Sequence, residues 1–68
     1  MLKDLNHDLV HQLSETSDSI WRMKQYHKNS QDCERCQKIW KTLENDFEKA
    51  SKMLADELAR HIKENKFD

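Results

Sequence analysis

Two cysteines three residues apart are the side chains of this protein best suited to chemistry. Cys33 and Cys36 form a Cys-x-x-Cys motif. In a turn or in the first turn of a helix, this spacing brings two sulfur atoms within reach of one metal ion or of each other. The motif is thus compatible with three states: free thiols packed as small apolar side chains, a metal site, or a thiol–disulfide pair.

Histidines could complete a zinc site around the cysteine pair. A closed structural zinc site needs four ligands, and thiolate and imidazole are among those that zinc prefers. His27 comes just before the pair, in phase with the apolar residues of the segment that precedes it. The fourth ligand would have to come from a second copy of the chain. The candidate site therefore comprises Cys33, Cys36 and His27 of one chain with His61 of the other.

A thiol-responsive module is the alternative use of the same pair. At a helix N-terminus beside Arg35 and Lys38, the helix dipole and the positive charges would lower the pKa of a thiol. Thioredoxin-like oxidoreductases, however, place the motif after a β-strand, and this sequence predicts no strands.

Composition argues against an enzyme. The 68 residues include no glycine and no proline, and phosphate-binding loops, dinucleotide-binding turns and nucleophile elbows all require glycine. His7 and His11 are four residues apart, but the interval lacks the glutamate of the metalloprotease helix motif. We therefore expect a protein that is not an enzyme.

Periodic apolar residues predict two amphipathic helices in one domain. Apolar side chains recur every three or four residues in two stretches. Charged residues make up 37% of the chain and apolar residues 35%, a bias typical of helices with solvated outer faces. We expect a single all-α domain over 1–68, a helical hairpin with one helix over about 2–29, a turn at 29–32 and a second helix over about 33–65. Ser30 or Asp32 is expected to cap the second helix.

The polar stretch 14–19 leaves an alternative fold open. Its serine, threonine and aspartate side chains compete with helix formation by bonding to nearby backbone. A break there would give a three-helix bundle. We favour a continuous helix, because Thr16 stays in phase with the apolar residues and neither glycine nor proline forces a stop.

The width of both apolar faces predicts a partner. Two helices packed on each other share one narrow seam, which would leave the shoulders of each face exposed. A homodimer that closes an antiparallel four-helix bundle is the economical way to cover them. The predicted interface comprises Val10, Trp21, Ile39, Met53, Phe47 and Leu54.

Charge favours one orientation of that dimer. Residues 19–43, around the turn, carry six basic and two acidic side chains, and the segments on either side are both net negative. Hairpins whose turns lie at opposite ends bring unlike charges together, whereas hairpins with adjacent turns bring like charges together. We therefore expect the antiparallel dimer, driven by burial of apolar surface.

The remaining expectations concern partners and location. Basic residues near the turn make weak nucleic-acid binding a second alternative, although an isoelectric point near 6.4 argues against it. No apolar run is long enough to span a bilayer or to form a signal-peptide core, so we expect a cytoplasmic protein without membrane contact. The sequence indicates a small interaction or regulatory protein that presents its bundle to another macromolecule, of unknown identity.

Overall fold

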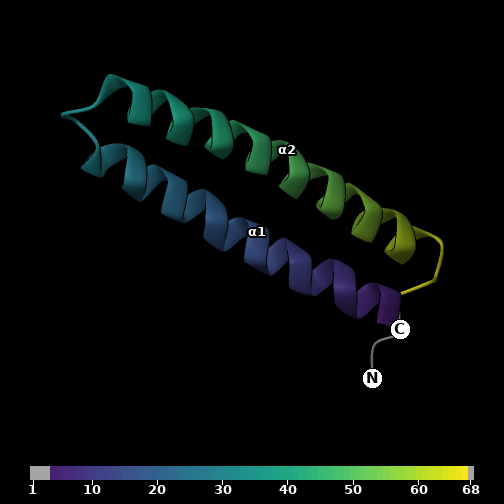
Figure 1. Ribbon diagram of the computed structural model, residues 1–68. Helices are drawn as coiled ribbons and strands as arrows, with labels where there is room; N and C mark the ends of the chain where they lie inside the picture. The colour runs from purple at the N-terminus through teal and green to yellow at the C-terminus, as the bar shows by residue number, and fades with distance from the viewer. Residues whose placement is uncertain (1–3, 68) are drawn as a thin grey trace.

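The structure is a helical hairpin. In the computed structural model, which describes residues 4–67, helix α1 (Asp4–Asn29) and helix α2 (Glu34–Lys63) lie side by side and run in opposite directions (Figure 1). The hairpin measures 49 × 18 × 12 Å, and residues 4–67 contain no strand. The predicted all-α hairpin is therefore confirmed, while the predicted start of its first helix near residue 2 lies outside the described residues.

Helix α1 passes through the polar stretch 14–19 without a break. Thr16 is buried against α2, and its hydroxyl accepts a hydrogen bond from Gln12 Nε2 at 3.0 Å. Ser19 Oγ accepts another from Arg22 Nη2 at 2.7 Å. Because both hydroxyls bond to side chains one turn away, they do not compete for the helix backbone. The three-helix alternative is therefore wrong.

A cysteine caps the start of α2. Cys33 has an extended backbone, and its sulfur accepts a hydrogen bond from the backbone N–H of Cys36 at 3.3 Å. Ser30 instead donates its hydroxyl to the carbonyls of Tyr26 and His27, which closes the end of α1. The prediction that Ser30 or Asp32 caps α2 is therefore wrong, because the helix begins at Glu34 and its N-cap position falls on Cys33.

Helix α2 ends in a Schellman motif. The N–H of Lys66 donates to the carbonyl of His61 at 2.7 Å, and the N–H of Asn65 donates to that of Ile62 at 3.2 Å. This geometry needs a left-handed residue, and Asn65 supplies it with φ 58°. The helix thus ends at Lys63 rather than near residue 65, and the following residues turn back toward α1.

The seam between the helices is narrow and partly polar. Buried or half-buried residues follow a seven-residue repeat, at 6, 9, 13, 16, 20, 23 and 27 in α1 and at 37, 40, 44, 47, 51, 54, 58 and 61 in α2. Among residues 4–67, Met23 is the one buried apolar side chain, and the other buried residues are Asn6, Thr16, Glu44 and His61. A single hairpin therefore removes little apolar surface from water.

Large apolar side chains remain outside this seam. Val10 is 40% exposed, Trp21 67%, Ile39 53% and Met53 68%, which confirms the prediction that two helices alone leave them uncovered. Within the described chain, neither helix has the length of apolar sequence that a bilayer crossing requires.

Candidate functional site

The hairpin places the predicted zinc ligands at its two ends. Cys33, Cys36 and His27 lie around the turn, whereas His61 lies near the opposite end. Across residues 4–67, no three histidine, cysteine or acidic side chains gather closely enough to hold a metal ion. A zinc site completed by His61 of a second copy stays a prediction.

The two cysteines at the turn are free and chemically unequal. Both thiols are half-buried. The hydrogen bond from the Cys36 thiol lowers the pKa of Cys33, and the backbone N–H groups of Cys36 and Arg35 add to this effect. The same thiol–thiol hydrogen bond, followed by burial, raises the pKa of Cys36. Cys33 is therefore the sulfur that ionises first.

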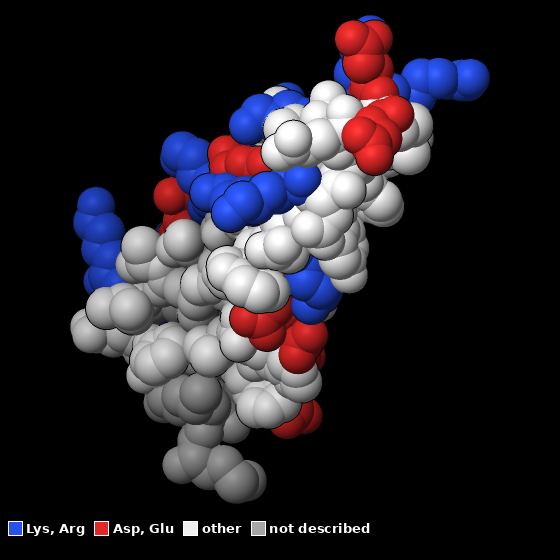
Figure 2. Space-filling model, turned by 90° about the vertical axis from the view of Figure 1, so that its left-hand side faces the viewer, with Lys and Arg blue, Asp and Glu red and all other residues white. Residues whose placement is uncertain are grey.

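Basic side chains surround the turn. Figure 2 views the hairpin from the turn end and shows Lys and Arg side chains in its upper part and along its left edge, interspersed with Asp and Glu. Beside the cysteines lies an open hollow of about 360 Å³, lined by His27, Glu34, Gln37, Lys38 and Lys41. Two ammonium groups and one imidazole could attract an anion there, but Glu34 offsets part of their charge. Nucleic-acid binding at this end stays a prediction.

A buried hydrogen-bond network closes the open end of the hairpin. The Nδ1 atom of His61 lies 2.6 Å from Asn6 Oδ1, and its Nε2 lies 2.9 Å from Glu57 Oε2. Asn6 also donates from Nδ2 to the carbonyl of Lys66 at 2.7 Å. The network thus joins the start of α1, the last turns of α2 and the segment after it. We call Asn6, Glu57 and His61 the clasp.

Both ring nitrogens of His61 are engaged in the clasp. The Asn6 oxygen is free to accept a hydrogen bond because its amide nitrogen is already a donor to the Lys66 carbonyl. Hydrogen bonding from Arg60, and to a lesser degree from His61, lowers the pKa of Glu57 to about 2, so this carboxylate is also an acceptor. In this arrangement neither nitrogen is left for a metal ion or a substrate.

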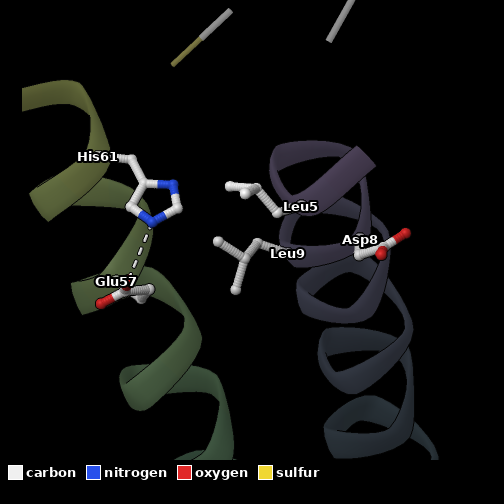
Figure 3. Close-up of a pocket in the computed structure, with 5 residues that line it drawn as sticks. All are labelled: Leu5, Asp8, Leu9, Glu57 and His61. Atoms are coloured by element: carbon white, nitrogen blue, oxygen red, sulfur yellow. Dashed lines mark hydrogen bonds and ion pairs between the residues drawn. The ribbon is translucent and has the colours of Figure 1, made fainter. Parts of the chain in front are cut away.

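A small apolar hollow adjoins the clasp. Figure 3 shows Leu5 and Leu9 pointing from α1 toward His61 and Glu57 on α2, while the carboxylate of Asp8 points away from α2. The hollow has a volume of about 420 Å³. Its histidine is already hydrogen-bonded to Glu57 and Asn6.

Sequence reasoning missed the clasp. Asn6 precedes Leu9 by three residues and Leu13 by seven, the spacing that also relates the apolar residues of the seam to one another. This spacing indicates that the Asn6 side chain lies in the seam. Its partner could not be identified without knowing how the two helices align.

A buried carboxylate lies in the middle of the seam. Glu44 is buried, with its carboxylate 3.7 Å from Lys41 Nζ and 4.0 Å from Lys24 Nζ. These lysines belong to different helices, so they mark one side of the seam. Seven-residue spacing places Val10 in line with Lys24 and Ile62 in line with Lys41. We define the lysine flank as Lys24, Lys41, Val10, Ile62 and the adjacent Trp21.

The opposite side of the seam carries more apolar surface. Leu5 and Glu57 line one hollow, and seven-residue spacing puts Tyr26 in line with Leu5, and Leu43 and Ala50 in line with Glu57. The ring of Tyr26 packs on Trp40 with centroids 5.1 Å apart. We define the tyrosine flank as Leu5, Tyr26, Ile39, Leu43, Ala50 and Met53.

The predicted interface residues are therefore distributed over three places. Ile39 and Met53 lie on the tyrosine flank, and Val10 and Trp21 lie on the lysine flank. Phe47 and Leu54 are half-buried in the seam itself. A single face-to-face contact between hairpins can cover one flank but not both.

Comparison of the chain with protein-family models, with curated proteins and with solved structures gives no match in any of the three.

Proposed function

We propose that this chain is a non-enzymatic helical interaction protein that works as a homodimer, in which two hairpins pack antiparallel into a four-helix bundle. The observation that supports this proposal is the contrast between the buried and the exposed apolar side chains of the hairpin. Met23 is buried, whereas Trp21, Ile39 and Met53 are each more than half exposed. Exposed apolar surface of this extent favours association.

The tyrosine flank is the surface that we assign to the second copy. Ile39 and Leu43 line a shallow, mainly apolar hollow of about 300 Å³ near the turn, and Leu5 and Leu9 line the hollow at the open end. Apolar residues thus extend along the whole hairpin on this side. One long face measures 49 by 18 Å, enough for the roughly 800 Å² per partner of a stable interface.

Charge supports opposite orientations of the two hairpins. The turn region, residues 19–43, has four more basic than acidic side chains, while residues 1–18 and 44–68 are net negative. In an antiparallel pair, each turn lies beside the open end of the other copy, and the long-range electrostatic energy is attractive. Surface charges of this kind select the orientation, and apolar burial supplies the affinity.

Such a dimer leaves the lysine flank free to contact another macromolecule. Val10 and Trp21 lie there beside Lys24 and Lys41, so this flank combines an indole ring with ammonium groups. Interfaces commonly use exposed aromatic side chains as anchors. A regulatory role through a macromolecular partner is consistent with this surface.

The test is the mass of the protein in solution. Light scattering coupled to gel filtration, at micromolar concentration, should give about twice the 8.2 kDa chain mass. The double variant Ile39→Glu and Met53→Glu should be monomeric, because four carboxylates would be buried in each dimer. The control Lys49→Glu changes the net charge by the same amount at an exposed position of α2 and should stay dimeric.

Two outcomes contradict parts of the proposal. A wild-type chain that is monomeric and fully helical by circular dichroism refutes the dimer. Dissociation by Val10→Glu with Trp21→Glu, but not by the Ile39 and Met53 changes, would place the second copy on the lysine flank instead.

A further inference from the structure

The first turn of α2 holds two thiols in a fixed arrangement. Cys33 is the N-cap residue, and Cys36 lies three residues further in the same turn. The backbone of Cys33 is anchored on both sides: its N–H donates to the Ser30 carbonyl at 3.0 Å, and its carbonyl accepts from the Gln37 N–H at 3.0 Å. Both cysteines therefore occupy ordered backbone, and the Cys33 sulfur accepts a hydrogen bond from the Cys36 N–H at 3.3 Å.

The surroundings leave these thiols open to reaction. Both side chains are half-buried rather than enclosed, because they lie at the end of the seam where α1 has already given way to the turn. The last carbonyls of α1 accept from the Ser30 hydroxyl rather than from a cysteine thiol. The Cys33 sulfur accepts instead from the Cys36 N–H of α2.

We propose that Cys33 and Cys36 are a reversible thiol–disulfide site, which low-molecular-weight disulfides oxidise to an intrachain disulfide. The observation behind it is the pairing of two accessible thiols within one helical turn, at the N-terminus of a 30-residue helix. Such a site goes beyond the proposed dimer and does not depend on it.

The reaction takes two exchange steps. The Cys33 thiolate attacks one sulfur of the disulfide R–S–S–R, forms a mixed disulfide and expels RS⁻, which takes up a proton. Cys36 then loses its proton and attacks the Cys33 sulfur, which expels the second RS⁻. The protein gives up two electrons and two protons, and the disulfide becomes two RSH molecules. An excess of RSH reverses both steps.

The geometry assigns the first step to Cys33. Its sulfur lies at the N-terminus of α2, where the N–H groups and the helix dipole stabilise a thiolate. Cys36 lies three residues further in the same turn, so it is placed to attack the mixed disulfide.

The experiment equilibrates the reduced protein in buffers with rising ratios of oxidised to reduced glutathione. Acid quenching, alkylation and mass spectrometry then count the free thiols. We expect the two thiols to disappear together, in a chain of unchanged length without adduct, at a midpoint independent of protein concentration. Repeating the titration in concentrated urea should require a higher ratio of oxidised to reduced glutathione, because the unfolded chain does not hold the pair together.

Single variants separate the two roles. Cys36→Ser should accumulate a glutathione adduct on Cys33, and Cys33→Ser should alkylate several-fold more slowly at Cys36 than Cys36→Ser does at Cys33. Circular dichroism of each variant checks that the hairpin is retained.

Three results would overturn the inference: thiols that stay reduced at every ratio, crosslinks between chains in place of the intrachain bond, or a wild-type protein that stops at stable glutathione adducts. The masses of the single variants, measured under reducing conditions, report on the dimer independently.

Discussion

Removal of the Asn6 side chain tests whether the clasp holds the hairpin closed. Asn6→Ala deletes the acceptor 2.6 Å from His61 Nδ1 and the donor 2.7 Å from the Lys66 carbonyl. Asn6 is fully buried, so water would not replace both contacts without rearrangement. A lost hydrogen bond that leaves its buried partner unpaired costs about 1–3 kcal/mol. His61 is buried, whereas Lys66 is exposed and water can reach its carbonyl, so we expect a loss of about 1–3 kcal/mol, mainly from the unpaired imidazole.

That loss is a sizeable fraction of the stability of a chain of this size. Folded domains are stable by roughly 0.05–0.15 kcal/mol per residue, which for 68 residues amounts to about 3–10 kcal/mol. The variant should therefore unfold at a lower temperature and at a lower urea concentration than the wild type. Urea titrations followed by circular dichroism give the difference in free energy of unfolding, at matched protein concentration because a dimer gains stability by mass action.

The matched control is Asn45→Ala, which makes the same substitution at an exposed position of α2. Both variants gain the same helix propensity, about half a kcal/mol, so their difference isolates the buried contacts. The double variant Asn6→Ala with His61→Ala should cost less than the sum of its single variants, because it leaves no imidazole unpaired. If the free energies of unfolding of Asn6→Ala and Asn45→Ala differ by less than about half a kcal/mol, the contacts of Asn6 in the clasp do not stabilise the hairpin and our reasoning is wrong.

Three further predictions follow from burial and charge. Arg60 lowers the pKa of Glu57 from 4.5 to about 2, so the stability from Glu57 is complete above pH 4.5 and is lost as the pH falls toward 2; Glu57→Gln should flatten that part of a plot of urea midpoint against pH. Met23→Ala should cost about 2–3 kcal/mol in chemical denaturation, whereas Met53→Ala should cost less than about 0.5 kcal/mol in a monomer and more as rising concentration forms the dimer. Loss of the N-cap in Cys33→Ala should reduce the free energy of unfolding by about 1 kcal/mol and lower the melting temperature, whereas Cys33→Ser, which keeps a capping side chain, should not.

The fold could be predicted from the sequence because apolar periodicity determines it. The spacing of apolar residues identified both helices, and Thr16, in phase with them, correctly favoured a continuous first helix. The exposure of Trp21 and Met53 was also predictable, since two helices cover only a narrow stripe of each other. These predictions depend on local spacing and on the width of a helix contact.

The clasp and the caps could not be predicted, because they depend on how the helices align. Asn6 and His61 are 55 residues apart in the sequence, and their contact requires the register set by the turn. The choice of Cys33 over Asp32 as cap required knowing the first residue of α2 to within one position. Asn65 ends α2 in a left-handed conformation that glycine usually adopts, and this chain has none to mark the position.

The polar residues in the seam have a consequence for alignment. Asn6 lies opposite His61, so a slide of α2 by one heptad would place Leu54 against Asn6, or Leu13 against His61. Either shift would place a buried amide or imidazole against a leucine side chain. Most other positions along the seam would still face a compatible residue. The clasp therefore selects a single axial alignment of the two helices.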